Sequence, residues 1–205
     1  MSGNPIVSGV AMQFVALAAL VLGLLGPLAP MAHDLLSAHM VQHLIAMNIA
    51  APLLAASLGN FQKWYSLGIV SATALQLAGF WFWHMPAVFA AAHHSVVLDG
   101  FMKLSLLLVA VLFWRAVLTV PRRWPALFAL LVTAKLFCLW GAVLVFARRP
   151  LYADQGSPAS WGLTALADQQ LAGLVMVSAC ALIYVSAATV IFCLWLVRDV
   201  EATAR

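Results

Sequence analysis

Residues 95–120 read SVVLDGFMKLSLLLVAVLFWRAVLTV, an apolar run long enough to cross a lipid bilayer as one helix. A crossing needs about 20 apolar residues, because each residue rises about 1.5 Å through a hydrocarbon core of about 30 Å. The two charges near the start of the run, Asp99 and Lys103, are four residues apart and are expected to pair on one helix face. This stretch therefore predicts a membrane-spanning helix.

Similar apolar runs occur along the whole chain. In its 205 residues, 65% are hydrophobic, 8% are charged and the mean hydropathy is +1.04, values outside the range of soluble domains. Residues 1–5 lack the positive charge of a signal peptide, so the first run is expected to be a retained helix. We predict an all-α integral membrane protein, one domain over residues 1–205 with a bundle of six transmembrane helices. The predicted spans are 6–25, 32–58, 64–83, 95–120, 125–147 and 168–197.

The basic residues predict how these helices are oriented. Six spans place both termini on the same side of the membrane, and most Lys and Arg residues fall on that side. They are Lys63, Arg115, Arg122, Arg123, Arg198 and Arg205, against Arg148 and Arg149 on the other. Because short cytoplasmic loops are enriched in Lys and Arg, both termini are expected to be cytoplasmic. The net charge of +4 is scattered over the ends of the runs, which indicates lipid and not nucleic acid as the partner.

All six histidines fall on the predicted outer side, three of them in or just before the second span. His39, His43 and Met47 follow each other at intervals of four, which forms one inclined stripe on a helix, and Met40 lies within about 100° of His39. An i, i+4 histidine pair can hold one metal ion, and imidazole with thioether favours copper. The alternative is that these side chains form hydrogen bonds between helices.

Three further histidines belong to the same predicted region. His84 stands beside Met85 and is held in place by Pro86, so it is predicted to be a third metal ligand, with Met40 and Met47 as sulfur ligands. His33 and His94 are predicted to support this site. Histidines are common at membrane interfaces, so the participation of His93 and His94 stays open.

Polar residues in the last two spans are predicted to support the site as well. Lys135 lies near the middle of the fifth span and is expected to turn inward, toward a carboxylate or a carbonyl. Asp168 and Gln169 begin the sixth span on the outer side, where a carboxylate can either cap the helix or orient a metal-bound imidazole.

No catalytic motif stands out. The chain has no nucleophile elbow and no phosphate-binding glycine loop. Cys138, Cys180 and Cys193 lack paired spacing and are interpreted as inert buried thiols, with a soft metal ligand among them as the alternative. Met176 is interpreted as a core methionine. We therefore expect a protein that is not an enzyme.

Several of these motifs resemble the CtaG family of caa3-type cytochrome c oxidase assembly factors. They are Ala38-His39-Met40-Val41-Gln42-His43-Leu44, Trp83-His84-Met85-Pro86-Ala87, Pro150-Leu151-Tyr152, and Ala167-Asp168-Gln169-Gln170-Leu171-Ala172-Gly173. The resemblance extends from about residue 33 to residue 196. It implies a multi-pass protein of the bacterial inner membrane that matures a haem–copper oxidase of the respiratory chain, with its histidine side facing the periplasm or exterior.

Individual residues carry this resemblance. The family's histidine positions in the second span correspond to His39 and His43, its Trp-His-x-Pro histidine to His84, and its Asp-Gln-x-x-Gly motif to Asp168, Gln169 and Gly173. Many relatives have two spaced histidines at the start of the fourth span, whereas this chain has the adjacent pair His93-His94 without a later one.

The leading hypothesis is a metallochaperone that binds copper, with Cu(I) favoured, at its outer face and passes it to a cytochrome c oxidase subunit. A membrane haem-binding electron carrier, with histidines as axial ligands, is one alternative. The other is a scaffold for oxidase assembly that binds no metal. Small residues in the first span (Gly9, Ala16, Gly23 and Gly26) permit close packing within the chain or between two copies, so a homo-oligomer stays open.

Overall fold

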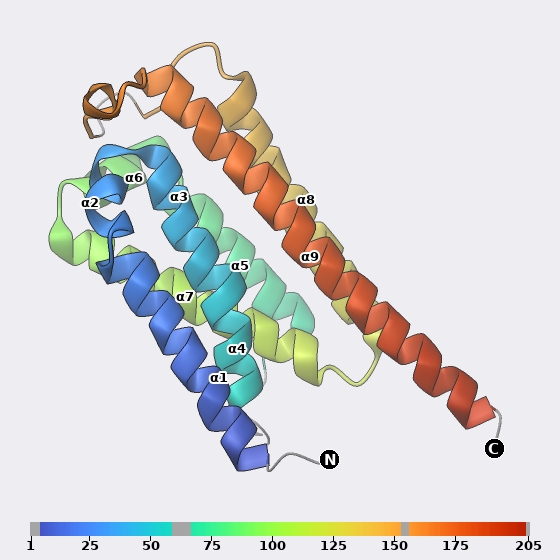
Figure 1. The fold of residues 1–205 in the computed structure, drawn as a ribbon. Coiled ribbons are helices and arrows are strands. Elements are labelled where there is room, and N and C mark those ends of the chain that lie inside the picture. Colours follow the sequence, from blue (N-terminus) through green and yellow to red (C-terminus); the bar gives the residue numbers. More distant parts are fainter. Residues whose placement is uncertain (1–4, 59–66, 153–155, 204–205) are drawn as a thin grey trace.

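The computed structural model describes residues 5–58, 67–152 and 156–203, and in these ranges the chain is helical. The long helices run roughly side by side, and α8 and α9 lie next to each other along one flank (Figure 1). In chain order the elements are α1 (Pro5–Leu20), the π-helical turn η1 (Val21–Leu25), α2 (Leu28–Asp34), α3 (Leu36–Leu44), the π-helical turn η2 (Ile45–Ala50), α4 (Ala51–Ser57), α5 (Ile69–Trp83), α6 (Pro86–His93), α7 (Val96–Thr119), α8 (Arg123–Phe146), the 3₁₀ turn η4 (Pro158–Trp161) and α9 (Ala165–Thr203).

Four helices in the described residues are long and apolar enough to cross a membrane. They are Leu36–Ser57, Val96–Thr119, Arg123–Phe146 and Ala165–Val197, and the pair Gly9–Leu25 and Leu28–Asp34 makes a fifth if its 45° bend is part of one span. The bend falls at Gly26-Pro27, where proline cannot continue the hydrogen-bond pattern of the preceding helix. The predicted number of six spans is therefore not confirmed.

The remaining predicted span is the shortest. Its helix, α5, has 15 residues, which corresponds to a length of about 22 Å at 1.5 Å per residue. That is less than the hydrocarbon thickness of about 30 Å. The predicted start of this span, 64–66, lies outside the described residues, as do Lys63 and Asp154.

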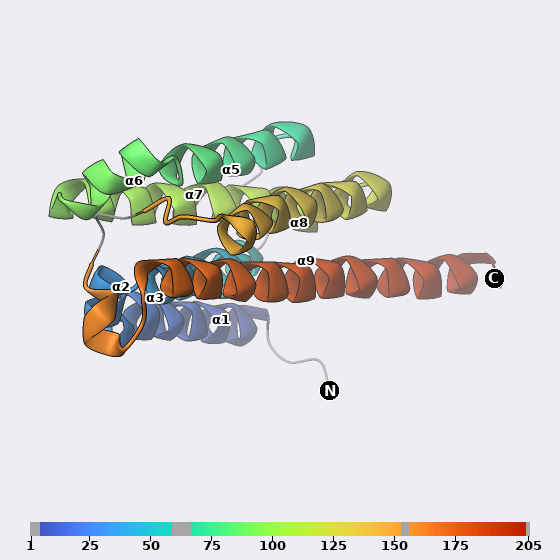
Figure 2. The same ribbon diagram turned by 90° about the horizontal axis from the view of Figure 1, so that it is seen from above.

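Different helix ends lie at the two ends of the molecule. The beginnings of α3 and α9 lie at one end together with the short helices α2 and α6, and this end is called the histidine end (Figure 1). α1 begins and α9 ends at the opposite end, close to the α7–α8 connection with Arg122 (Figure 1). Viewed from above, α9 extends beyond the other helices there (Figure 2). The membrane side that each end faces stays a prediction.

The predicted second span, 32–58, is not one regular α-helix but a series of helical segments. Leu35 is extended (φ −123°, ψ 126°), so α3 begins at Leu36 and not at the predicted Ala32, and His33 belongs to α2. The π-helical turn η2 comes just before Pro52, whose missing N–H leaves a carbonyl of the preceding turn without its usual partner. The Met47 carbonyl in this turn accepts a hydrogen bond from Trp114 Nε1 of α7 at 2.9 Å. This bond fixes the depth of the Met47 side chain.

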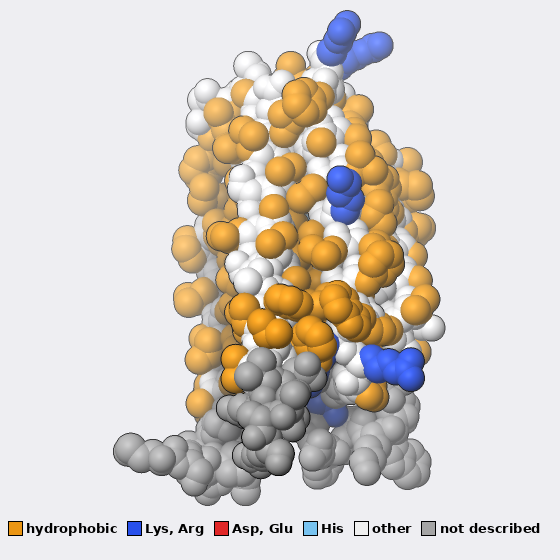
Figure 3. Space-filling view, turned by 90° about the vertical axis from the view of Figure 1, so that its right-hand side faces the viewer, with side chains coloured by type: hydrophobic (Ala, Val, Ile, Leu, Met, Phe, Trp, Pro, Cys, Tyr) orange, Lys and Arg blue, Asp and Glu red, His pale blue; other side chains and the backbone are white. Residues whose placement is uncertain are grey.

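The core is built from aromatic side chains that join α5, α7, α8 and α9. Phe80 packs against Phe137 with ring centroids 4.2 Å apart, and Tyr184 stacks on Trp114 at 5.6 Å. The Tyr184 hydroxyl also accepts a hydrogen bond from Gln76 Nε2 at 3.0 Å. Outward faces carry large exposed hydrophobic side chains, as a surface in contact with lipid requires (Figure 3).

Candidate metal site

A pair of imidazoles lies at the centre of the candidate site. His39 and His43 are one turn apart on α3, and each is only 4% exposed. Their Nε2 atoms face each other at 2.7 Å. In the neutral pair, one of these nitrogens donates a proton and the other accepts it. The predicted stripe on the second span is thus a histidine pair in the interior of the bundle.

His84 lies next to this pair and is held in one tautomer. It follows the last residue of α5, its Nδ1 is 2.7 Å from the carbonyl of Phe80, and its ring stacks on the Phe80 ring. Because a carbonyl only accepts, Nδ1 carries the proton and Nε2 presents a lone pair. This Nε2 is buried and has no hydrogen-bond partner among the described residues. The His43 and His84 ring centroids are 5.5 Å apart.

A contact with Tyr152, outside α5, holds His84, and Phe89 packs against Tyr152 in turn. Tyr152 donates a hydrogen bond from its hydroxyl to the His84 carbonyl at 2.5 Å. Phe89 of α6 packs its ring against the edge of His39 and also contacts Tyr152, with centroid distances of 4.8 and 5.0 Å. The sequence predicted that Pro86 holds His84 in place, and the contact with Tyr152 was not predicted.

On its inner side, His43 borders a small cavity lined by sulfur. The cavity has a volume of about 10 Å³, and its lining includes Met40, Met47, Met176 and Cys180. All four of these side chains are at most 2% exposed. The structure thus brings the predicted Met40 and Met47 together with Met176, which was interpreted as a core methionine, and Cys180, for which an inert thiol was preferred over a metal ligand. Met176 and Cys180 are four residues apart on α9, and Asp168 lies two such steps before Met176. This spacing places all three on one helical face, so the sequence could have predicted that Met176 and Cys180 lie on the side of the site.

On its outer side, the histidine pair is reached through a cleft at the histidine end. The cleft has a volume of about 390 Å³, and His33, His93 and His94 line it near the surface, with His39 as a further lining residue. The His33 and His93 rings are 4.8 Å apart at their centroids. Burial lowers the pKa of His93, and the neighbouring His33 and His94 imidazoles lower it further. A lower pKa keeps this imidazole neutral and able to donate a lone pair.

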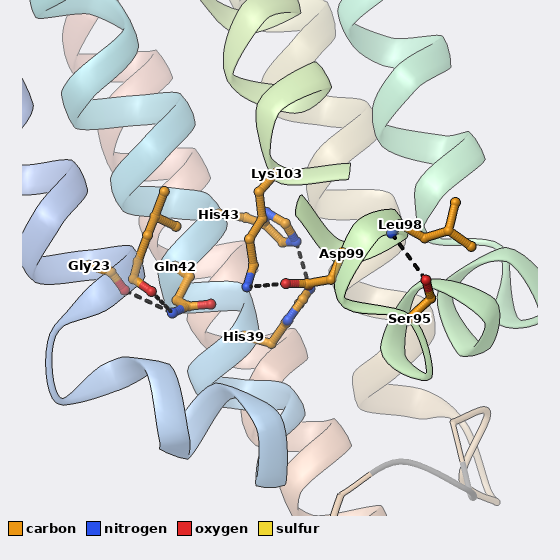
Figure 4. A network of polar contacts seen from close by, with 9 residues as sticks. Gly23, His39, Gln42, His43, Ser95, Leu98, Asp99 and Lys103 are labelled. Atoms are coloured by element: carbon orange, nitrogen blue, oxygen red, sulfur yellow. Dashed lines mark hydrogen bonds and ion pairs between the residues drawn. The ribbon is translucent and has the colours of Figure 1, made fainter. Parts of the chain in front are cut away.

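An ion pair also borders the cleft. Lys103 Nζ lies 2.7 Å from Asp99 Oδ2, as the i, i+4 spacing predicts. The two side chains lie beside His39 and His43 (Figure 4). With Asp99 as its partner, the lysine is not an isolated charge in the bilayer.

Asp168 does not contact a histidine through any of its hydrogen bonds. Its carboxylate accepts from the backbone N–H groups of Leu36 and Ser37 at 2.6 and 3.1 Å, and from the Ser37 hydroxyl at 2.5 Å. These are the unpaired donors at the beginning of α3, where a carboxylate is favoured by the helix dipole. The prediction that Asp168 orients an imidazole is therefore replaced by its alternative, a helix cap. The cap acts across two helices and fixes the first turn of the helix that carries the histidine pair.

Gln169 and Lys135 also take other roles than predicted. Gln169 accepts from Leu151 N–H at 2.6 Å and donates to the Leu144 carbonyl at 3.3 Å, so it joins α9 to the end of α8. Lys135 is exposed. The buried side of α8 contains Ala134 and Phe137, and because consecutive residues of a helix are rotated by about 100°, Lys135 between them points to another side. The prediction that Lys135 turns inward is wrong.

In the described residues as they stand, no group of three or more His, Cys, Asp or Glu side chains is close enough together to hold a metal ion. The strongest donor set is therefore the histidine pair, with one further nitrogen at His84 and thioether sulfur on the inner side. His33 and His94 lie farther out and are exposed.

The family of cytochrome c oxidase caa3 assembly factors, Caa3_CtaG, matches residues 68–198. The chain belongs to this family. Its members' description implies a role in the maturation of cytochrome c oxidase and contact with oxidase components. The match includes His84, Asp168, Gln169 and Gly173 but begins after His39 and His43, so the assignment of these two histidines to family positions stays a prediction. Neither a curated protein nor a solved structure shows significant similarity to the chain.

Proposed function

We propose that this caa3 assembly factor binds copper(I) between His39, His43 and His84 and delivers it at its outer face to an oxidase subunit. The observation that carries the proposal is the buried Nε2 of His84, which has a free lone pair beside two further imidazoles. A buried polar atom without a partner is rare and costs free energy unless it serves a function.

The imidazole pair suits an ion that replaces a proton. At 2.7 Å, the two Nε2 atoms share one hydrogen. A copper ion would take a lone pair from each Nε2, and the shared proton would move to Nδ1 of the ring that carries it, so that both imidazoles stay neutral ligands. Because metal–imidazole bonds are about 2 Å long, the two nitrogens must move apart by about 1 Å to admit the ion. His84 or a thioether then supplies the third donor.

The surroundings favour copper(I) over a harder cation and over haem. Thioether and imidazole ligands are soft and select Cu(I) among the common biological metals. The cavity of about 10 Å³ inside His43 has room for sulfur atoms to approach an ion but not for a porphyrin ring. A dry, apolar shell of Phe80 and Phe89 keeps water away from the nitrogens.

Delivery requires that the ion can leave. The cleft of about 390 Å³ leads from exposed His33 and His94 to His39, so ligand exchange with a partner needs no unfolding of the bundle. The outer imidazoles offer weaker intermediate ligands along this route. In this proposal the protein carries copper and catalyses no reaction.

Titration of the purified protein with copper(I) against a chromogenic chelator tests this function. We expect about one tightly bound ion per chain, and a roughly tenfold weaker affinity in His84→Gln because one of three donors is lost. The matched control is His94→Gln, which removes an exposed imidazole and should leave the affinity of the buried site within a factor of about two. Binding that is absent in the folded wild-type protein would overturn the proposal, as would equal affinities for wild type and His84→Gln.

A further inference from the structure

Lys135 lies in the middle of an apolar helix. It stands twelve residues after Arg123, the first residue of α8, and eleven before Phe146, the last. At 1.5 Å per residue, both helix ends are about 17 Å or more away. A space-filling view of this flank shows a basic side chain partway up the apolar surface, between basic groups near the two ends (Figure 3).

The side chain points to the outside of the bundle. Phe128, Leu131 and Leu139 are exposed to 72%, 50% and 51%, and they share one helical face with Lys135. The ion pairs of the described residues are Lys103 with Asp99 and His33 with Asp34, so Lys135 takes part in none of them. Among the described residues, this ammonium at the depth of the hydrocarbon core therefore has no countercharge.

The lysine can reach neither water at the membrane surface nor a lipid headgroup. A lysine side chain reaches about 6 Å, so its ammonium does not extend to either membrane surface from this depth. For the same reason, a lipid headgroup is out of reach. An intramembrane charge of this kind is costly and is usually paired with another group in the membrane.

We propose that the outward face of α8 is the docking site for a transmembrane helix of another protein that carries Asp or Glu at the middle of the bilayer. Charge complementarity selects this partner, because a carboxylate at matching depth converts an isolated charge into an ion pair. Hydrophobic side chains around Lys135 exclude water from such a pair and strengthen it.

A second copy of this chain does not supply the carboxylate. The Asp and Glu residues of the sequence all lie near helix ends or in a connection. Asp34, Asp99 and Asp168 belong to the histidine end, Asp199 and Glu201 lie in the last turns of α9, and Asp154 lies outside the described residues. Parallel or antiparallel pairing of two copies through α8 therefore leaves Lys135 without a partner at its own depth.

An apolar groove lies close to Lys135 on the surface of α8. An apolar groove of about 290 Å³ runs between α5 and α8 and includes Val70, Leu77, Phe128 and Val132 in its lining. Val132 is three residues from Lys135, so the groove leads up to the lysine along the same face. A docked helix would place apolar residues in the groove and its carboxylate one to two turns farther along.

This interaction can be measured with a synthetic probe. The full chain, labelled with a donor fluorophore, is reconstituted in phosphatidylcholine vesicles with an acceptor-labelled, leucine-rich peptide of about 20 residues that has Glu at its centre. We expect energy transfer to report an association at least about tenfold tighter than for the same peptide with central Gln. Lys135→Arg should keep this preference, and Lys135→Met should reduce Glu binding to the level of Gln.

Two controls make the result specific. Arg149→Met removes a positive charge just beyond the end of α8 and should leave the preference for Glu intact. A peptide with Glu at its end instead of its centre should bind no better than the Gln peptide. Equal binding of the Glu and Gln peptides to the wild-type chain would overturn the proposal, and so would a preference that survives Lys135→Met. Copper plays no part in this experiment, so its outcome is independent of the proposed function.

Discussion

Cells that depend on this protein for oxidase maturation are expected to lose at least about nine-tenths of their cytochrome c oxidase activity when His39 and His43 are both replaced by glutamine. Both nitrogens of the buried pair disappear together, and the loss of metal ligands or their close partners typically lowers affinity by 10–100-fold for each change. Oxidase activity of isolated membranes, normalised to the amount of assembly factor, gives the measurement. Glutamine keeps a polar side chain of similar length, so the helix that carries the pair is retained.

The control for this experiment is the double variant His33→Gln and His94→Gln, which removes two exposed imidazoles from the outer cleft. It should retain most of the oxidase activity at high external copper. Excess copper should also partly restore activity in the buried-pair variant if copper supply is its defect. Full oxidase activity in cells with a normal amount of the buried-pair variant would instead support a scaffold that binds no metal.

Gly173→Ala is expected to lower the free energy of unfolding by about 2–3 kcal/mol, because it inserts a methyl group where α8 and α9 touch. A Cβ atom at Gly173 would lie 2.5 Å from the Gly141 carbonyl oxygen, 2.8 Å from Val145 Cγ2 and 3.0 Å from Leu144 Cβ. A backbone oxygen cannot move aside as a side chain can, so the two helices must separate. Thermal unfolding in detergent measures the effect.

The matched control is Gly100→Ala in α7, where a Cβ atom would meet no atom within 4 Å. Alanine is the better helix former, so this variant should be as stable as the wild type or more stable by up to about 1 kcal/mol. Equal stability of Gly173→Ala and Gly100→Ala would show that the contact between α8 and α9 is looser than the structure places it.

The local part of the site could be predicted from sequence spacing. Residues four apart on a helix share a face, which is why the His39–His43 pair and the Lys103–Asp99 ion pair were both predicted correctly. The apolar runs likewise indicated the helical membrane fold. These inferences depend only on the geometry of a single helix, and that geometry is the same in every protein.

What depended on the contacts between helices could not be read from the sequence. Asp168 was correctly placed in the first turn of its helix, but the helix phase decides whether a carboxylate meets an imidazole or the first turn of α3. The expectation that Lys135 turns toward the interior of its own bundle failed, because α8 turns its small and aromatic residues toward the core. The extended backbone at Leu35, which separates α2 from α3, has no signal of its own such as glycine or proline.

The sulfur residues around the cavity beside His43 also could not be recognised as a group from the sequence. Met47 was predicted as a sulfur ligand from its place in the histidine stripe, whereas Met176 was interpreted as a core methionine, which is usually a space filler. Only the packing of α3 against α9 places Met176 and Cys180 with Met47 around one cavity beside His43. The grouping of these sulfur atoms beside His43 is therefore visible only in the tertiary structure.

X-ray absorption at the copper edge of the purified, copper(I)-loaded protein tests whether the buried histidines bind copper. We expect two or three imidazole nitrogens at about 2.0 Å, recognisable by scattering from the rest of the ring, with or without one sulfur at about 2.3 Å. In His39→Gln with His43→Gln, the imidazole scattering should fall to one ring or disappear. A copper environment without imidazole in the wild-type protein, or one that is unchanged in this double variant, would show that His39 and His43 do not bind copper.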